Sequence, residues 1–293
     1  MWDKNIGGIC MAVNLHFNKP SAPIHISHRF RDTMNVMTQY HAHDEHYEVY
    51  YLIKGKRKYF IKDKTYYVNE GDIVFINKGD LHRTFYVDDF EHERLLINFR
   101  ADFLNCEYGS YAYLLDLVFQ QPIIIQLNFK EKQRFEDILY SMVNEVQKDD
   151  EGQELYLKTL LVQLLINSVR HLANNNADSQ EYTGNVYNKV TEIIHYINEH
   201  YDDDSISLES ISDTFYISPY YLSRIFKNVT GFTYTEYLNH VRIQKAQRML
   251  KESNLKVIDI AGKVGFNSLT HFGRVFKNNT RYTPSAYRKI HKV

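Results

Sequence analysis

The chain has 293 residues, which is long enough for two domains with separate hydrophobic cores. The formal net charge of −1 conceals an uneven distribution. Residues 214–293 hold 14 Lys and Arg against three acidic residues, a net of +11, and residues 1–213 carry −12. A basic C-terminal block indicates a polyanionic partner for that block alone. The two cysteines, Cys10 and Cys106, exclude a disulfide framework and have no metal-ligand spacing, which fits a reducing compartment.

The N-terminal residues do not have the pattern of a secretion signal. Residues 1–16 contain a short apolar stretch, but Ile9 takes the position before Cys10 where a lipoprotein signal needs a small residue. The longest later apolar run, Leu160–Ile166, is far too short to cross a membrane. We therefore expect a soluble, cytoplasmic protein that does not associate with a membrane.

From about Ile24 to Phe99, the sequence has a strand pattern. Short runs rich in Tyr, Val, Ile and Phe alternate with turn residues such as Lys54-Gly55 and Glu70-Gly71. The expected strands are Tyr47–Ile53, Lys58–Ile61, Thr65–Val68, Ile73–Ile76, His82–Val87 and Leu95–Phe99, followed by Pro122–Leu127. So many short strands at regular spacing favour a small sandwich or barrel.

Two motifs in this region resemble those of cupin barrels. They read His41-x-His43-x4-Glu48-x6-Gly55 and Gly71-x7-Gly79-x2-His82. In metal-binding cupins, the residues that match His41, His43, Glu48 and His82 hold a divalent ion, and this donor set suits Fe, Mn, Zn or Ni. Taken alone, the set would indicate a metalloenzyme.

After residue 128 the apolar residues recur with helical spacing, first from Phe135 to Val146 and then from Leu157 to Leu172. The second stretch also offers Leu155 and Val169, so its apolar stripe is wide. Such a helix packs on two sides, either within its own domain or against a second subunit, and both options stay open. The polar, aperiodic stretch that begins at Ala173 is typical of an interdomain linker.

The C-terminal part repeats itself at an offset of 50 residues. Ser223–Tyr237 and Gly273–Tyr287 share Arg, Phe, Lys, Asn, two Thr and Tyr, which makes seven matches in fifteen positions. Each copy follows a short helix and a tight turn. This arrangement predicts two similar recognition helices for two major-groove segments of a duplex.

In the first copy, a helix is predicted from Ser218 to Asn228, with Ser218 as N-cap and Pro219 at the first helical position. The residues expected at base edges are Tyr220, Ser223 and Arg224, and Lys227 is expected at phosphate. In the second copy, Ser268 is the predicted N-cap. Its expected base contacts are Leu269, Thr270 and Arg274, with Lys277 at phosphate. A long amphipathic helix between the copies would hold them about 34 Å apart.

The strings GFTYTEYLNHVRIQKAQRML and IDIAGKVGFNSLTHFGRVFKNNTRYTPSAYR closely resemble the DNA-binding domain of AraC/XylS-type transcription regulators. The resemblance covers about residues 186–290. It implies two helix-turn-helix units joined by a helix and bound to adjacent major-groove segments of double-stranded DNA. Two positions depart from the family pattern, because Ser212 replaces a usual Ala and Arg281 replaces a usual Gly. Arg281 is expected to strain the helix end or to contact phosphate.

Regulators of this type often carry a cupin-like sensor, and the resemblance implies that its motif residues contact a small effector. The expected effector site consists of His41, His43, Glu48, His82 and Tyr50. Further aromatic walls from Tyr59, Tyr67 and Phe75 would suit a carbohydrate or a similar polar ring compound. A metal held by the two motifs, or a purely structural role for their residues, stays open.

The chain offers no nucleophile constellation, phosphate-binding Gly loop or paired catalytic carboxylates, so an enzyme would depend on the four cupin-like residues alone. We predict an α+β protein without enzymatic activity and without a cofactor. Its parts would be a cupin-like barrel that binds effector in residues 1–128, a helical dimerisation segment in 129–173, a linker in 174–185, and an all-α DNA-binding domain in 186–293.

The predicted protein is a homodimer that responds to an effector and contacts RNA polymerase. Two alternatives stay open. One is a metal-dependent cupin enzyme fused to a DNA-binding domain, and the other is an effector-independent DNA-binding dimer.

Overall fold

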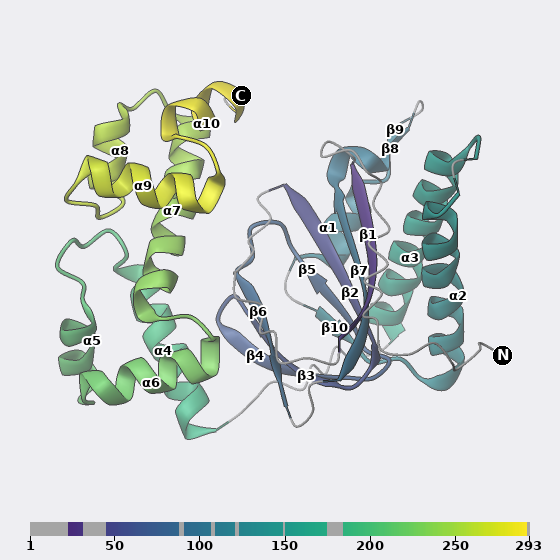
Figure 1. Ribbon diagram of the computed structural model, residues 1–293, viewed down its shortest axis with the longest axis horizontal. Coiled ribbons are helices and arrows are strands. Elements are labelled where there is room, and N and C mark those ends of the chain that lie inside the picture. Colours follow the sequence, from purple (N-terminus) through teal and green to yellow (C-terminus); the bar gives the residue numbers. More distant parts are fainter. Residues whose placement is uncertain are drawn as a thin grey trace. The chain divides into compact units, whose positions relative to one another are not determined.

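The computed structural model describes residues 23–31, 45–87, 91–106, 109–120, 123–148, 150–174 and 184–291 (Figure 1). The chain divides into two compact units, with the main boundary after residue 181. The first unit is built from strands and a few helices, and the second is helical. The predicted α+β fold class is thereby confirmed.

The first unit contains two main sheets. The larger sheet has the strand order β1(Ile24–Arg31), β7(His92–Arg100), β2(His46–Lys54), β5(Ile73–Ile76), β10(Ile123–Ile125), and its neighbouring strands are antiparallel. The smaller sheet has the order β4(Lys64–Asn69), β3(Lys56–Ile61), β6(His82–Tyr86). A short pair, β8(Asn105–Cys106) and β9(Gly109–Ser110), stands apart.

The described strands do not form the closed barrel that we expected. No ladder between them joins the three-stranded sheet to either edge of the five-stranded sheet. The two sheets instead face each other through a shared apolar layer, in which Tyr50 and Leu52 from β2 meet Tyr59 and Ile61 from β3. Side-chain packing, rather than continuous hydrogen bonding, therefore holds the two sheets together.

Successive residues of β2 point to opposite faces of the large sheet, as in any strand. Tyr47, Val49 and Tyr51 lie in the core that faces the helices, whereas Tyr50 and Leu52 lie in the layer between the sheets. Both faces of β2 are therefore buried, which explains why its sequence is apolar and aromatic almost throughout.

Helices α2(Phe129–Val146) and α3(Gln153–Asn174) lie side by side and cover one face of the large sheet (Figure 1). Helix α2 begins with a capping box, because Asn128 Oδ1 accepts from the Glu131 amide at 3.0 Å and Glu131 Oε2 accepts from the Asn128 amide at 3.0 Å. The Tyr51 hydroxyl donates to the Glu136 carboxylate and so ties β2 to α2. The short helices η1(Ala101–Leu104) and α1(Tyr113–Val118) complete this unit.

The second unit consists of seven helices within its described residues. They are α4(Asn185–Glu199), α5(Leu208–Thr214), α6(Pro219–Thr230), α7(Tyr234–Glu252), α8(Val257–Lys263), α9(Leu269–Thr280) and α10(Pro284–His291). Helix α7 runs between two smaller bundles, with α6 near one end and α9 near the other (Figure 1). At 19 residues, α7 is about 28 Å long. Across the described parts of both units, no helix has the length and apolar character that a membrane span requires.

Candidate functional sites

Helix α6 is held by its N-cap and by one buried face. Ser218 Oγ accepts from the Tyr221 amide at 3.2 Å, and Pro219 opens the helix, as predicted. Leu222 and Phe226 are fully buried, and the Phe226 ring lies 5.6 Å from the Tyr237 ring on α7. The four residues predicted to contact DNA from this helix are all exposed: Tyr220, Ser223, Arg224 and Lys227.

Helix α9 repeats this arrangement. Ser268 Oγ accepts from the His271 amide at 3.3 Å, and Phe272 and Phe276 are buried. The Phe276 ring lies 5.4 Å from the ring of Tyr287 on α10. The predicted contacts of the second unit are likewise exposed: Leu269, Thr270, Arg274, Lys277 and Arg281. The two helices therefore present equivalent polar faces from equivalent cores.

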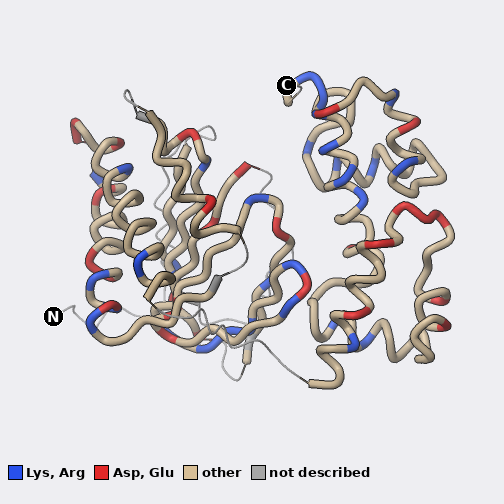
Figure 2. The backbone as a smooth tube through the Cα atoms, turned by 180° about the vertical axis from the view of Figure 1, so that it is seen from behind, with Lys and Arg blue, Asp and Glu red and all other residues tan. Residues whose placement is uncertain are grey.

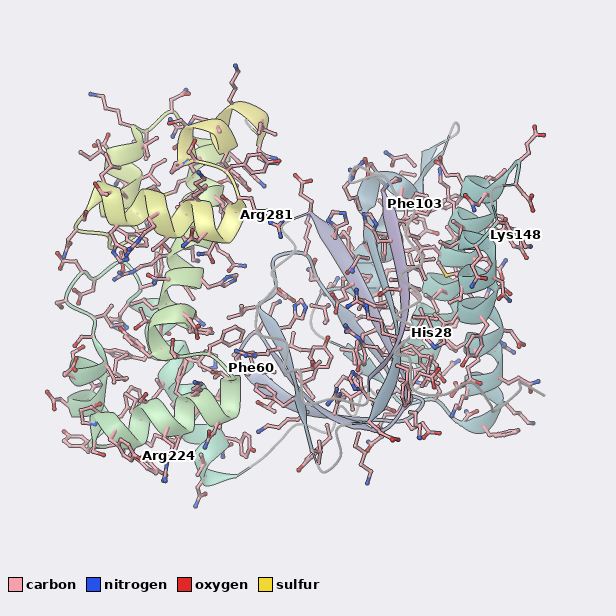
Figure 3. All side chains as sticks on the ribbon, viewed as in Figure 1. His28, Phe60, Phe103, Lys148, Arg224 and Arg281 are labelled. Carbon is pink, nitrogen blue, oxygen red and sulfur yellow. The ribbon has the colours of Figure 1, made fainter. Side chains whose placement is uncertain are left out.

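The two helices also end in the same way but with different residues. Gly231 has φ 79° and Arg281 has φ 67°, and each donates its amide to the carbonyl four residues earlier at 2.8 Å. Glycine adopts this left-handed conformation freely, whereas an arginine does so under strain. Arg281, labelled in Figure 3, is thus the strained helix end expected from the sequence.

A buried arginine on α7 joins the two halves of the helical unit. Arg242 donates to the carbonyl oxygens of Tyr201 at 2.7 Å and Asp203 at 2.9 Å, and its guanidinium lies 5.5 Å from the Phe266 ring centroid. Gly265 has φ +85°, and a Cβ there would lie 2.7 Å from Arg242 Nη2. Burial lowers the pKa of Arg242, although the nearby Tyr234 and the acidic turn raise it.

Charge is distributed unevenly within the helical unit. Acidic residues lie on the turn before α5 and on α5 itself, whereas basic residues gather around α8 to α10 (Figure 2). The acidic turn contains Asp202, Asp203 and Asp204, which would repel a duplex. Its peptide carbonyls bind Arg242, so the turn also has a structural role.

In the first unit, the structure brings three of the predicted effector residues into one buried cluster. Tyr59 Oη donates to Glu48 Oε1 at 3.2 Å, and His82 Nε2 lies 3.6 Å from Glu48 Oε2. The Tyr50 ring packs edge-on against Tyr59 with 5.3 Å between centroids. His41 and His43 lie outside the described residues.

Glu48 and His82 form a buried pair of a carboxyl group and an imidazole. Burial alone would lower the pKa of His82, but the charge of Glu48 and hydrogen bonds to Glu48 and Asp80 raise it above its usual value. Within the described residues, no group of three or more potential metal ligands is present.

Of the four aromatic residues expected to line the effector site, two face the layer between the sheets, and Phe75 and Tyr67 do not. Tyr50 and Tyr59 face the layer between the sheets. Phe75 lies in the core under the helices, because it pairs with Val49, which points to that face. On β4, Tyr66 and Val68 face the layer, which places the intervening Tyr67 on the opposite side.

The layer also holds basic residues that the sequence did not single out. Arg57 is buried and donates from Nη2 to His92 Nε2 at 2.8 Å. Arg94 is buried beneath the Tyr50 ring, with its guanidinium 5.5 Å from the ring centroid. The sequence shows that Arg57 and Arg94 alternate with residues of the opposite face of their strands. It does not show which of the two faces points between the sheets, because that depends on the strand register.

Comparison with known proteins agrees with this division into two units. Residues 23–165 match the model of an AraC-like ligand binding domain, and residues 211–290 match that of a helix-turn-helix domain. The chain belongs to the AraC family.

Several characterised and uncharacterised members of the AraC family are similar to this chain. The uncharacterised regulator YijO of Escherichia coli is 33% identical over 53% of this chain and 53% of its own length. The regulatory protein PocR of Salmonella typhimurium is 34% identical over 34% of this chain and 33% of its own length. The activator RhaS of Escherichia coli is 26% identical over 58% of this chain and 59% of its own length. The matched stretches thus span about a third to three fifths of these relatives.

Proposed function

We propose that this AraC-type protein is a transcription regulator that binds double-stranded DNA and responds to a small-molecule effector. The observation that carries the proposal is the repeated exposed face on two capped helices. Arg224 on α6 and Arg274 on α9 occupy equivalent exposed positions fifty residues apart. Two equivalent basic faces at the ends of a helix about 28 Å long suit two successive major-groove segments.

The proposed division of labour follows from position on each helix. Tyr220, Ser223 and Arg224 lie in the N-terminal half of α6, and Leu269, Thr270 and Arg274 lie in that of α9, so these six would read base edges. Lys227, Lys277 and Arg281 lie nearer the C-terminal ends and would bind phosphates. A DNA-binding role requires the compartment that holds the DNA, so a cytoplasmic location belongs to the same proposal.

For the first unit, we propose effector binding in the layer between the two sheets, by Glu48, His82 and Tyr50 together with His41 and His43. The buried polar atoms of this cluster support the proposal, because a purely structural core has little use for them. A carbohydrate is the first effector class to test, since aromatic rings can stack on it while carboxylate and imidazole groups bind its hydroxyls.

Dimerisation through residues 129–173 is a further part of the proposal. Leu155 and Tyr156 are exposed on α3, whose other face is fully buried against the sheet and α2. Effector binding would change how residues 174–185 restrain the DNA-binding units of the two subunits, and so whether both can bind together. Contact with RNA polymerase would then convert occupancy into regulation.

Two rival functions make different predictions. A metal-dependent enzyme would retain stoichiometric metal when purified without chelator. An effector-independent DNA-binding dimer would show the same DNA affinity whether or not a ligand stabilises its first unit.

The proposed DNA contacts are tested by selecting preferred sequences from random duplex DNA with the full chain and with variants. Arg224→Ala and Arg274→Ala should each weaken binding by about 1–3 kcal/mol and relax the preference at a few base pairs. Lys189→Ala, on the exposed surface of α4, is the matched control and should change neither. If the wild-type chain selects no sequence, or both Arg variants select the same one, the proposal fails.

A further inference from the structure

Arg94 is a buried cation in the layer between the two sheets. Its side chain projects from β7, and the residue is only 6% exposed. Within the described part of the chain no ion pair involves Arg94, and its Nε has no hydrogen-bond acceptor. Its guanidinium lies 5.5 Å from the centroid of the Tyr50 ring. Buried charges in proteins are normally paired, so Arg94 is suited to bind an anion.

Two further arginines lie beside Arg94 or in the same layer. Arg29 on β1 lies directly opposite Arg94 in the antiparallel ladder, and directly opposed like charges are unfavourable. Arg57 reaches the same layer from β3 and donates to His92, so that imidazole is an acceptor and brings no negative charge.

Among the described residues, neither the carboxylate of Glu48 nor the phenol of Tyr50 forms an ion pair with Arg94. Glu48 accepts from Tyr59 and faces His82. Burial raises the pKa of Tyr50, although the charges of Arg94 and Arg57 lower it, so its phenol stays neutral at physiological pH. Asn98 lies two residues from Leu96 on the same face of β7, and its Oδ1 has no hydrogen-bond donor among the described residues. A ligand that offers both an anionic group and a hydroxyl would satisfy Arg94 and Asn98 together.

We infer that the effector carries an anionic group, a carboxylate or a phosphate, which binds Arg94 in the layer between the two sheets. A guanidinium offers paired N–H donors that match the oxygens of either group. The inference rests on the proposed effector-binding role of the first unit and narrows the carbohydrate class to acidic or phosphorylated members. Acidic sugars and sugar phosphates share this chemistry with other hydroxy acids.

The test compares matched neutral and anionic probes on the full chain. Thermal unfolding is measured with glucose, galactose, glucuronate, galacturonate, glucose 6-phosphate and inorganic phosphate at constant ionic strength. At least one anionic probe should raise the melting temperature of the wild-type chain, and its binding should weaken at least about tenfold in Arg94→Met. Glucuronate and galacturonate against glucose 6-phosphate separate carboxylate from phosphate.

The same variant provides a second readout that needs no ligand. If Arg94 serves to bind a ligand anion, Arg94→Met should leave the melting temperature of the ligand-free chain unchanged or raise it. The reason is that the substitution removes an uncompensated buried charge. A marked fall would show that Arg94 is part of the folded framework and would overturn the inference. Stabilisation by a neutral sugar in both proteins, or a panel with no Arg94-dependent shift, would overturn it as well.

The outcomes keep this inference separate from the proposed function. Sequence-specific DNA binding by the ligand-free chain, measured on the same protein, tests the regulator. If DNA binding holds and the anionic probes fail, only the ligand class is wrong. If an anionic probe binds through Arg94 but never changes DNA affinity, the effector role is wrong and the anion site stands.

Discussion

Asp72 illustrates how one buried group in the first unit is coupled to pH. It follows Gly71 in the second cupin-like motif, and its Oδ2 accepts from the Asn69 amide at 2.7 Å. Burial raises the pKa of Asp72 to about 6, although the hydrogen bonds from Asn69 lower it. The folded chain therefore binds a proton here over a range in which the unfolded chain has released it.

This raised pKa predicts a specific pH dependence. The free energy of unfolding should decrease as the pH rises from about 4 to about 6, because the unfolded state binds fewer protons than the folded state in that range. Asp72→Asn keeps an acceptor for the Asn69 amide and should remove this component. Urea denaturation of both proteins across the range measures it, and parallel curves would contradict the assignment.

The left-handed backbone conformation of Arg281 predicts an effect on stability. Arg281→Gly should stabilise the chain by about 1 kcal/mol, because glycine adopts φ 67° without strain. Gly231→Ala, at the equivalent helix end with φ 79°, is the reciprocal variant and should destabilise it. Equilibrium unfolding measures both. A loss of stability in Arg281→Gly would mean that the Arg281 side chain makes a stabilising contact that outweighs the strain.

At the level of helices and strands, much could be predicted from local patterns. Strand β5 has the predicted bounds, and α6 begins after the predicted cap Ser218, since both signals lie within a few residues. The strand β1 lay within the predicted β region without being delimited, and α1 was not predicted. Their patterns are short, and their formation depends on the neighbouring sheet.

The site in the first unit was only partly predictable, for a physical reason. The cupin-like motifs identified Glu48 and His82, but Arg94 and Arg57 have no motif. Whether such a residue points between the sheets or toward the helices is decided by strand register. Phe75 was predicted on the wrong face of the sheet for the same reason, because its partner Val49 points toward the helices.

Arg242 on α7 packs closely against Gly265 and the Tyr201 carbonyl group, where the two halves of the helical unit meet. Gly265→Ala should destabilise the chain by about 2 kcal/mol or more, because its Cβ would lie 2.7 Å from Arg242 Nη2 and 2.8 Å from the Tyr201 carbonyl oxygen. Gly262→Ala, on α8 with open space around it, should leave stability unchanged or raise it. Thermal unfolding of the two variants compares them directly. Equal effects on stability would mean that Arg242 can move away from the added Cβ without a loss of stability.

At the scale of the whole chain, the separation of charge predicts the salt dependence of DNA binding. Residues 214–293 carry a net of +11 on a chain whose overall charge is −1. Binding should therefore weaken steeply with salt, and Lys277→Ala should reduce the slope of log K against log salt by about 1 without changing sequence preference. Fluorescence anisotropy over a salt series measures the slope. An unchanged slope would remove Lys277 from the phosphate contacts.

The alternation of side chains along β2 places two distant environments on neighbouring residues. Tyr50 faces Arg94 in the layer between the sheets, and Tyr51, the next residue, is bonded to Glu136 on α2. A single peptide unit thus separates the layer between the sheets from the helical layer. A shift of the β2 backbone that accompanied binding at the proposed site would reach α2 through one peptide unit and the Tyr51–Glu136 hydrogen bond.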